Sequence, residues 1–285
     1  MAMQNLQRSY WNGLSAEYQN VMRISCDDFH YGPQIPGDSR LRLLPPLRRG
    51  MRALELGCGG GQNSVFLAGK GLDCTAIDIS SAQLAHARRS ASRAGVSIRF
   101  ILSPIERFAD KVTGSFDLIH SSHAFEFIDD PAATIAQCAE RLSPGGTLLV
   151  STVHPLYNGE WVENLDEDGN PCGMGLFLEN YFSPPDDVRR KADGSVDVVS
   201  RAYPVSAWFG WMRAAGLEVT AICEPPEQAD GTPPYTSDDW RDNECELAAI
   251  PGTLVVAARR PCRTAARASA VSATAAPGAP LAAAP

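Results

Sequence analysis

The sequence lacks several patterns that would assign it to other classes of protein. Its eight cysteines contain no C-x-x-C pair, and no histidine cluster joins them at zinc spacing, so the sequence predicts no metal site. Scattered cysteines of this kind are typical of reduced thiols in a cytosol. The N-terminus has no basic stretch followed by an apolar run, and no apolar run reaches the roughly 18 residues of a membrane span. We therefore expect a cytoplasmic protein without a signal peptide or a transmembrane segment.

Positive charge is also scarce in this chain. Its 285 residues include 25 lysines and arginines against 33 aspartates and glutamates, which gives a net charge of −8 at pH 7. An acidic surface repels the phosphate backbone of DNA and RNA. We therefore expect a small molecule as the partner, and neither a nucleic acid nor a membrane. The sequence leaves open whether the protein forms a homodimer.

What the sequence does have is a regular alternation of short apolar runs with helix-like segments. Such alternation predicts an α/β fold in which crossover helices connect the strands of a mostly parallel sheet. The expected strands are Arg52–Leu56, Asp73–Ile77, Ile98–Leu102, Phe116–Ser121, Thr147–Thr152, Glu218–Cys223 and Thr253–Ala258. The expected helices are Asn63–Lys70, Ser81–Ala94, Pro131–Leu142 and Ser206–Ala215. No helix with good periodicity separates the last two strands, which favours an antiparallel final strand.

Three parts of the chain stand outside this alternation. Residues 1–50 predict an N-terminal helical cap, with a helix around Tyr10–Met22 and an apolar segment at Leu41–Leu47. Residues 51–260 form the main domain, which residues 155–204 interrupt as a lid or substrate insertion with a hairpin turn at Asp193-Gly194. Residues 261–285 are almost all Ala, Pro, Ser, Thr and Arg, a composition typical of a disordered tail.

The most specific local pattern is the glycine loop ELGCGGGQN at residues 55–63. An apolar strand runs into four glycines within five positions and then into a helix, so that free backbone N–H groups face a bound ligand. Asp78 ends the next strand, where its carboxylate could accept both hydroxyls of a ribose or cap the following helix. A nicotinamide- or flavin-dependent oxidoreductase is the alternative. Its G-x-G-x-x-G fingerprint would need a third glycine where this chain has Gln62.

Two later segments complete a set of motifs: FDLI at Phe116–Ile119 and LSPGGTL at Leu142–Leu148. Together with ELGCGGG and Asp78, they resemble class I S-adenosylmethionine-dependent methyltransferases, and the match is strongest over residues 50–155. The resemblance implies a Rossmann-like sheet of seven strands in the order 3-2-1-4-5-7-6, with S-adenosylmethionine over the carboxyl ends of the first strands. It says little about the acceptor of the methyl group.

The resemblance also implies which residues contact the cofactor. Asp78 would hold the ribose, and Ile79 would lie against the adenine. Ser103 stands where relatives usually carry an aspartate, so Ser103 or backbone groups would recognise the adenine amino group. The segment with Trp11 and Tyr18 resembles a helix that closes over the cofactor. The full set implied in cofactor binding is Tyr18, Glu55, Gly57, Gly59, Gly61, Asp78, Ile79, Ser103, Ile105 and Ser121.

Three residues are candidates for the catalytic base. His154 ends the fifth strand, where ligands of open parallel sheets bind, and histidine can take a proton near neutral pH; its alternative role is a loop cap before Pro155. Glu126 occupies a position that is often acidic in relatives, and it could instead anchor the acceptor. His123 precedes it, while Phe127 stands where many relatives carry a histidine; the alternative for His123 is a partly buried, hydrogen-bonded side chain. The sequence does not decide among the three, and His154 is the first candidate.

These observations predict an enzyme that transfers a methyl group to an oxygen, nitrogen or carbon atom of a small-molecule acceptor, in specialised metabolism. Trp161, Tyr181 and Phe182 of the insertion could stack on a flat acceptor. The alternatives are a nicotinamide-dependent oxidoreductase, a non-catalytic or regulatory relative that binds the cofactor, and a tRNA or protein methyltransferase. The last is disfavoured by the acidic charge and by the lack of an Asn/Asp-Pro-Pro-Tyr motif after the fourth strand.

Overall fold

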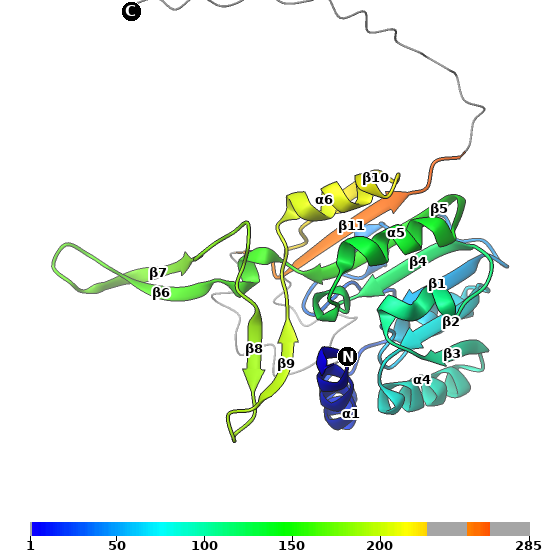
Figure 1. Ribbon diagram of the computed structural model, residues 1–285, viewed down its shortest axis with the longest axis horizontal. Coiled ribbons are helices and arrows are strands. Elements are labelled where there is room, and N and C mark those ends of the chain that lie inside the picture. The colour runs from blue at the N-terminus through cyan, green and yellow to red at the C-terminus, as the bar shows by residue number, and fades with distance from the viewer. Residues whose placement is uncertain (1, 227–249, 263–285) are drawn as a thin grey trace, which may run out of the picture.

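The computed structural model of the protein describes residues 2–226 and 250–262, and its centre is one large sheet (Figure 1). The sheet has seven strands in the order β10-β11-β5-β4-β1-β2-β3. Strands β1 to β5 pair in parallel, whereas β11 runs antiparallel to both β5 and β10. Because β10 and β11 are the sixth and seventh strands of this sheet along the chain, the predicted Rossmann-like order and the antiparallel final strand are confirmed.

The elements of the sheet and its helices lie close to the bounds expected from the sequence. The strands are β1 (Arg52–Leu56), β2 (Asp73–Asp78), β3 (Ile98–Leu102), β4 (Phe116–Ser122), β5 (Leu142–Val153), β10 (Glu218–Cys223) and β11 (Thr253–Arg259). The helices are α1 (Ala2–Met22), α2 (Asp38–Leu41), α3 (Gln62–Gly69), α4 (Ser81–Ala94), α5 (Pro131–Arg141) and α6 (Val205–Ala214), with short 3-10 helices η1 (Ile105–Asp110), η2 (Phe125–Phe127) and η3 (Pro155–Asn158). Among the strands the largest difference is in β5, which begins five residues earlier, at Leu142 instead of Thr147.

Local capping explains why the helix bounds could be read from the sequence. Ser80 caps α4 by accepting a hydrogen bond from the backbone N–H of Gln83, and Gly95 ends the helix with φ of 65°. Asp130 caps α5 in the same way, with Pro131 in its first turn. Ser80 and Gly95 therefore mark the two ends of α4, and Asp130 marks the start of α5, through short-range signals in the sequence.

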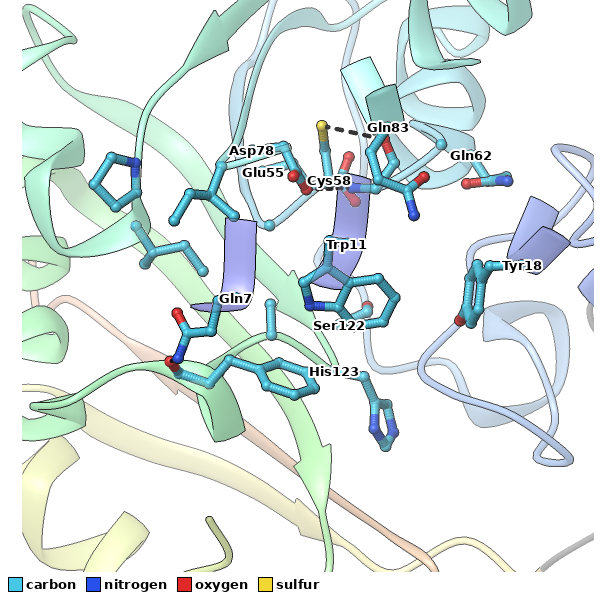
Figure 2. A pocket seen from close by; sticks show the side chains of 18 of the residues that line it. Gln7, Trp11, Tyr18, Glu55, Cys58, Gln62, Asp78, Gln83, Ser122 and His123 are labelled. Atoms are coloured by element: carbon cyan, nitrogen blue, oxygen red, sulfur yellow. Dashed lines mark hydrogen bonds between the residues drawn. The ribbon is translucent and has the colours of Figure 1, made fainter. Parts of the chain in front are cut away.

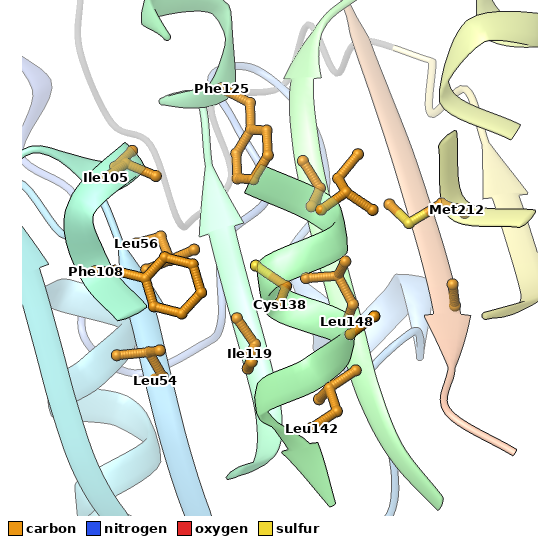
Figure 3. Packing of buried hydrophobic residues seen from close by; sticks show 14 of the residues in the cluster. Leu54, Leu56, Ile105, Phe108, Ile119, Phe125, Cys138, Leu142, Leu148 and Met212 are labelled. Atoms are coloured by element: carbon orange, nitrogen blue, oxygen red, sulfur yellow. The ribbon is translucent and has the colours of Figure 1, made fainter. Parts of the chain in front are cut away.

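Both faces of the sheet are buried, as a parallel sheet requires. Side chains of β1 alternate: Leu54 and Leu56 join one hydrophobic cluster, and Ala53 joins the other. The first cluster packs η1, α5 and α6 against the sheet around Phe108 and Trp208, and Figure 3 shows part of it. The second cluster lies on the opposite face, where the segment before β1 and helix α3 cover the sheet.

The N-terminal part has a longer helix than the sequence predicted, and its second apolar segment is mostly not helical. Helix α1 starts earlier than expected and spans Ala2–Met22, while the segment Leu41–Leu47 is mostly irregular. Leu43 and Leu47 pack against the second cluster, which explains the apolar pattern without a helix. Helix α1 stands at the carboxyl edge of the parallel strands, between α4 and the hairpin with β9 (Figure 1).

The insertion at residues 155–204 forms two antiparallel hairpins. Strands β6 (Glu160–Leu165) and β7 (Pro171–Phe177) project from the body as a long arm (Figure 1). Strands β8 (Asp187–Arg190) and β9 (Val196–Ser200) turn at Asp193-Gly194, as predicted, and return toward α1. The sequence predicted one hairpin, and the arm of β6 and β7 was missed.

Neither a membrane-spanning segment nor a metal site is found in the parts of the chain described. No helix among residues 2–226 and 250–262 is long and apolar enough to cross a membrane. Over the same residues, no group of three or more histidine, cysteine, aspartate or glutamate side chains could hold a metal ion. The predicted tail, 261–285, lies outside the described residues from position 263 onward.

Candidate active site

A main pocket opens at the carboxyl ends of β1, β2 and β4, beneath helix α1. It holds about 850 Å³ of space that no atom fills, counted out to the solvent at its mouth. Figure 2 shows Trp11 reaching from α1 into the middle of the pocket, between Asp78 and Cys58 on one side and Ser122 and His123 on the other.

The glycine loop forms the floor of this pocket through two glycines with positive φ. Gly57 has φ of 75°, and the backbone N–H groups of Gly57 and Cys58 both donate to the carbonyl of Ile77. A Cβ on Gly57 would lie 2.3 Å from the Cβ of Ala124, so this glycine is required by close packing. Gly59, with φ of 50°, is different because a Cβ there would meet no protein atom within 4 Å. Its backbone therefore faces open space that a ligand can enter.

Asp78 stands beside this open space and is held by the loop itself. Its Oδ2 accepts a hydrogen bond from the Gly59 N–H at 2.8 Å, and its Oδ1 accepts one from the Ser80 N–H at 2.7 Å. Ser80 supplies the side-chain cap of α4, which excludes the alternative of Asp78 as the side-chain cap. Burial raises the pKa of Asp78 to about 6. Each oxygen keeps acceptor capacity for a ribose hydroxyl, as the sequence predicted.

Glu55 is the second buried acid of the pocket. Its Oε2 accepts hydrogen bonds from the Ser64 hydroxyl and from the Ser64 N–H, the latter at 3.1 Å. Desolvation raises the pKa of Glu55 to about 8, despite these two bonds. The nearest ring is that of His120, whose Nδ1 lies 4.0 Å from Oε1 and whose own pKa burial lowers to about 3. A cationic ligand group beside Glu55 would favour the charged carboxylate.

Helix α1 covers the pocket, and its polar side chains form hydrogen bonds with residues on the other side of the pocket. Gln19 accepts a hydrogen bond from the Gln62 amide at 2.7 Å and donates to the side chain of Gln83 at 3.0 Å. At the other end of the helix, Gln7 donates to the carbonyl of Phe127. The Trp11 and Phe127 rings meet edge to face, with centroids 5.5 Å apart. These contacts fix α1 over the site, which agrees with the expected closing helix.

Most residues predicted to bind the cofactor line this pocket. Those found in its lining are Tyr18, Glu55, Gly57, Gly59, Asp78, Ile79 and Ile105. Gly61, Ser103 and Ser121 are not among the lining residues. A Cβ on Gly61 would collide with Ala87 of α4, Ser103 bonds to the carbonyl of Pro104, and Ser121 donates to the carbonyl of Leu56 at 2.7 Å. These three residues support the walls of the pocket, and their contacts with the cofactor stay predictions.

A second pocket of about 660 Å³ adjoins the main one, and His123 and Phe127 line both. Its walls come from the N-terminal cap, the ends of β5 and β11, and the hairpin of β8 and β9. That hairpin contributes Asp187, Arg189 and Ser200, so the insertion lines part of this pocket, and its role as a lid stays a prediction.

His123 and Glu126 form a bonded pair at the boundary of the two pockets. The His123 Nδ1 lies 3.1 Å from Oε1 of Glu126, and its Nε2 lies 3.1 Å from the Thr253 hydroxyl. The buried Glu126 also accepts a hydrogen bond from the Thr152 hydroxyl at 3.2 Å. His123 has φ of 50°, a left-handed conformation that is rare outside glycine and is found most often at functional sites.

His154 is placed differently from the sequence-based expectation. Its Nδ1 accepts a hydrogen bond from the Leu156 N–H at 3.2 Å, which caps η3, and its Nε2 lies 2.8 Å from Oε1 of Glu224. Desolvation lowers the pKa of His154. The ring lines neither pocket, so the loop-capping alternative describes its position. His154 as the base stays a prediction, whereas His123 lines both pockets and Glu126 the second one.

The aromatic residues of the insertion also contribute less than expected. The Tyr181 hydroxyl accepts a hydrogen bond from the Val205 N–H at 3.4 Å, and Phe182 is 79% exposed. The side chain of Trp161 lies outside the described part of the chain. Tyr157 is the aromatic residue of the insertion that does line the second pocket, next to Val153.

We expect Asp78→Ala to weaken S-adenosylhomocysteine binding by about 1.5–3 kcal/mol, because a charged hydrogen-bond partner is lost. Isothermal titration calorimetry measures this change. The control is Asp73→Ala, which removes an exposed aspartate from the other end of β2 and should leave the affinity unchanged. An unchanged affinity in Asp78→Ala would exclude Asp78 from the ligand site.

Glu55→Gln should stabilise the ligand-free protein at alkaline pH. Because the folded-state pKa of about 8 exceeds the ordinary 4.5, folded protein binds the proton more tightly, and stability falls as pH rises from 4.5 to 8. The shift corresponds to a cost of about 5 kcal/mol above pH 8, which glutamine would largely avoid. Urea unfolding between pH 5 and 8.5 tests this, with exposed Glu218→Gln as the control. An unchanged pH slope in Glu55→Gln would contradict it.

The described residues fit S-adenosylmethionine. Open space beside Gly59 admits a ligand against the backbone, the buried Asp78 can accept ribose hydroxyls, and Glu55 offers a carboxylate to an ammonium group. Apolar Ile79 and Ile105 lie along the same wall, where a flat ring can pack. Gln62 stands where a nicotinamide-binding fingerprint would have its third glycine. Its side-chain amide donates a hydrogen bond to Gln19 of α1 and so helps to hold the roof of the pocket.

Comparison with known proteins agrees with this site. A family model described as a methyltransferase domain matches residues 29–222. The ubiquinone biosynthesis O-methyltransferase of Saccharophagus degradans is 36% identical over 180 residues, which cover 60% of this chain and 65% of that protein. The chain spans between about half and two thirds of the length of the curated relatives it matches.

Solved structures show the same fold. An S-adenosylmethionine-dependent methyltransferase from Mesorhizobium loti has a TM-score of 0.58 at 25% identity, and the match covers 77% of this chain and 95% of that one. One from Listeria monocytogenes has a TM-score of 0.60 at 19% identity, with 77% and 94% covered. The family match covers most of the chain and includes the glycine loop, Asp78 and the His123–Glu126 pair. The chain therefore belongs to this methyltransferase family, as a class I enzyme whose cofactor is S-adenosylmethionine.

Proposed function

We propose that the enzyme methylates a hydroxyl oxygen of a small molecule bound in the second pocket, with His123 as the base. The observation that carries this proposal is the position of His123, which lines the main pocket and the second pocket at once. A base that removes a proton from the acceptor must lie where the acceptor meets the methyl donor. His123 meets this condition, and His154 does not.

The hydrogen bonds of His123 define how it would hold and take a proton. When Nδ1 carries its hydrogen, it donates to Oε1 of Glu126, and Nε2 keeps a lone pair toward the Thr253 hydroxyl. An acceptor hydroxyl that replaces Thr253 as the donor would pass its proton to Nε2. Glu126, held by Thr152, then stabilises the protonated ring. S-adenosylmethionine, when bound, supplies an electrophilic methyl group, so that alignment and one base suffice.

The second pocket supports a hydroxylated ring as the acceptor. Pro33, Phe127 and Val153 offer apolar surface, while the Arg189 guanidinium offers donors to polar substituents. The name of the Saccharophagus relative, an O-methyltransferase of ubiquinone biosynthesis, favours oxygen over nitrogen or carbon. The name of this relative gives no support to a role in specialised metabolism, which stays a prediction. A small-molecule partner and the absence of a nucleic-acid or membrane partner also stay predictions. Whether the protein forms a homodimer stays open.

Transfer to matched acceptors tests the proposed oxygen specificity. Purified protein is incubated with methyl-labelled S-adenosylmethionine and, separately, with 4-methylcatechol, 4-methylaniline and indole. We expect label in the ether product of the catechol, because its hydroxyl can take the place of the Thr253 hydroxyl and becomes a strong nucleophile when His123 removes its proton, whereas the aniline nitrogen attacks through its own lone pair and gains little from a base. Label in the aniline or the indole, with none in the catechol, would contradict oxygen as the acceptor atom.

A further inference from the structure

A third groove lies beside the roof of the main pocket, between the C-terminal end of α1, the segment after it, and helix α4. It holds about 1250 Å³ counted out to the solvent. Among the described residues, its lining includes Arg23, Arg89, Arg93 and His86, whose pKa is lowered by desolvation and by the two neighbouring arginines, and it includes no aspartate or glutamate. Such a lining is unexpected in a chain with a net charge of −8. We call these residues and the space between them the arginine groove.

The basic side chains of α4 in this groove share one face of the helix. His86, Arg89 and Arg93 are spaced by three and four residues, which places them in a row. Among the described residues, no carboxylate lies within 4.0 Å of Arg89 or Arg93; Arg93 donates to the Ser90 hydroxyl at 3.3 Å. Like charges at this spacing repel each other, so the row destabilises α4 slightly unless an anion binds.

The opposite wall of the groove belongs to α1. Arg23 follows the last residue of this helix and lines the groove opposite the row on α4. Gln19 and Gln62, which lock α1 over the main pocket, line the arginine groove as well. An anion held by arginines on both walls would therefore connect the roof to the body of the enzyme.

We propose that the arginine groove binds a soluble phosphate-bearing molecule, which bridges α1 to α4 and thereby favours the closed main pocket. Arginine fits this role because its guanidinium forks match phosphate oxygens in pairs. A diphosphate group is favoured over a single phosphate because it offers more oxygens to the three arginines that line the groove. A free molecule is favoured over a lipid headgroup because the arginines line a groove instead of projecting from a flat face.

Binding of the cofactor product and of the anion should then be coupled. Calorimetry with inorganic pyrophosphate as the probe, at constant ionic strength, should show binding to the wild-type protein. Saturating pyrophosphate should tighten S-adenosylhomocysteine binding about fivefold or more, and S-adenosylhomocysteine should tighten pyrophosphate binding by the same factor, as linkage requires. This expectation does not depend on which acceptor is methylated, since no turnover is measured.

Paired variants separate the groove from general charge effects. Arg89→Gln with Arg93→Gln should abolish both pyrophosphate binding and the coupling, while Arg88→Gln with Arg99→Gln removes the same charge outside the arginine groove and should retain them. Equal binding in the two double variants, or no binding to the wild type, would overturn the proposal. Weaker S-adenosylhomocysteine binding in pyrophosphate would overturn it too, because it would place the anion in the main pocket. Binding to phosphatidylglycerol vesicles without pyrophosphate binding would assign the groove to a lipid.

Discussion

Replacing His123 by asparagine should lower kcat about a hundredfold or more, while S-adenosylhomocysteine affinity stays within about twofold. The imidazole is the group that lines both pockets and is bonded to Glu126 on one side and Thr253 on the other. Asparagine is the appropriate replacement because it tolerates the left-handed backbone at φ of 50°, which alanine would strain. Steady-state kinetics with the best acceptor, together with calorimetry of the folded variant, measure the two quantities.

Two further variants show whether the effect belongs to the base. Glu126→Gln should also lower kcat, since it removes the carboxylate that stabilises the protonated ring, and His154→Ala should leave kcat near the wild-type value. His154→Ala is the matched control because it removes the other histidine at the carboxyl edge of the sheet, where it caps η3. If His154→Ala were inactive and His123→Asn active, the base would lie at the end of β5. If all three variants kept full rate, transfer would proceed by alignment alone.

The elements of the fold could be predicted because their signals are local. Arg52–Leu56 reads as a buried strand from its own apolar residues, and helix Ser81–Ala94 begins after a capping serine and ends at a glycine. The arm of β6 and β7 was missed for the same reason. Glu160–Leu165 has no regular apolar alternation, and its partner strand is rich in glycine, so its pairing depends on the turn at Gly169.

The glycine-loop side of the site and the presence of a covering helix were largely predictable, whereas the polar contacts of that helix were not. Gly57, Gly59 and Asp78 belong to one strand–loop–helix unit and the strand beside it, so a sequence motif contains their geometry. The glutamines at positions 7 and 19 of α1 look like ordinary surface residues in the sequence. They reach the pocket only because α1 packs across elements that lie far along the chain, and no local pattern records such a contact.

The choice of histidine could not be made from the sequence for a related reason. The rule that ligands bind at the carboxyl ends of parallel strands places His154 and His123 equally well. Their side chains differ because Glu224 and the first turn of η3 hold the ring of His154 away from the pockets. Thr253, 130 positions from His123, instead holds that ring at the boundary of the two pockets. Only the tertiary structure distinguishes the two cases.

Gly57→Ala and Gly59→Ala should separate the two tasks of the glycine loop. Alanine at Gly57 would combine a positive φ with a Cβ placed 2.3 Å from that of Ala124. Left-handed strain of about 1–2 kcal/mol and overpacking of about 1–3 kcal/mol add to a loss of roughly 2–5 kcal/mol in the free energy of unfolding. A loss of this size lowers Tm by about 6–15 °C in a domain of this length. Thermal unfolding without ligand measures it.

Alanine at Gly59 carries the same backbone strain but meets no protein atom within 4 Å, so Tm should fall by only about 2–6 °C. Its Cβ projects into the space beside Asp78, where we expect the cofactor, and S-adenosylhomocysteine binding should therefore weaken about tenfold or more. Calorimetry on the folded variant measures this loss. The two glycines have similar φ, so strain alone would give both variants the same Tm and the same affinity. Equal Tm values and equal affinities in the two variants would contradict the assignment of Gly57 to packing and of Gly59 to ligand binding.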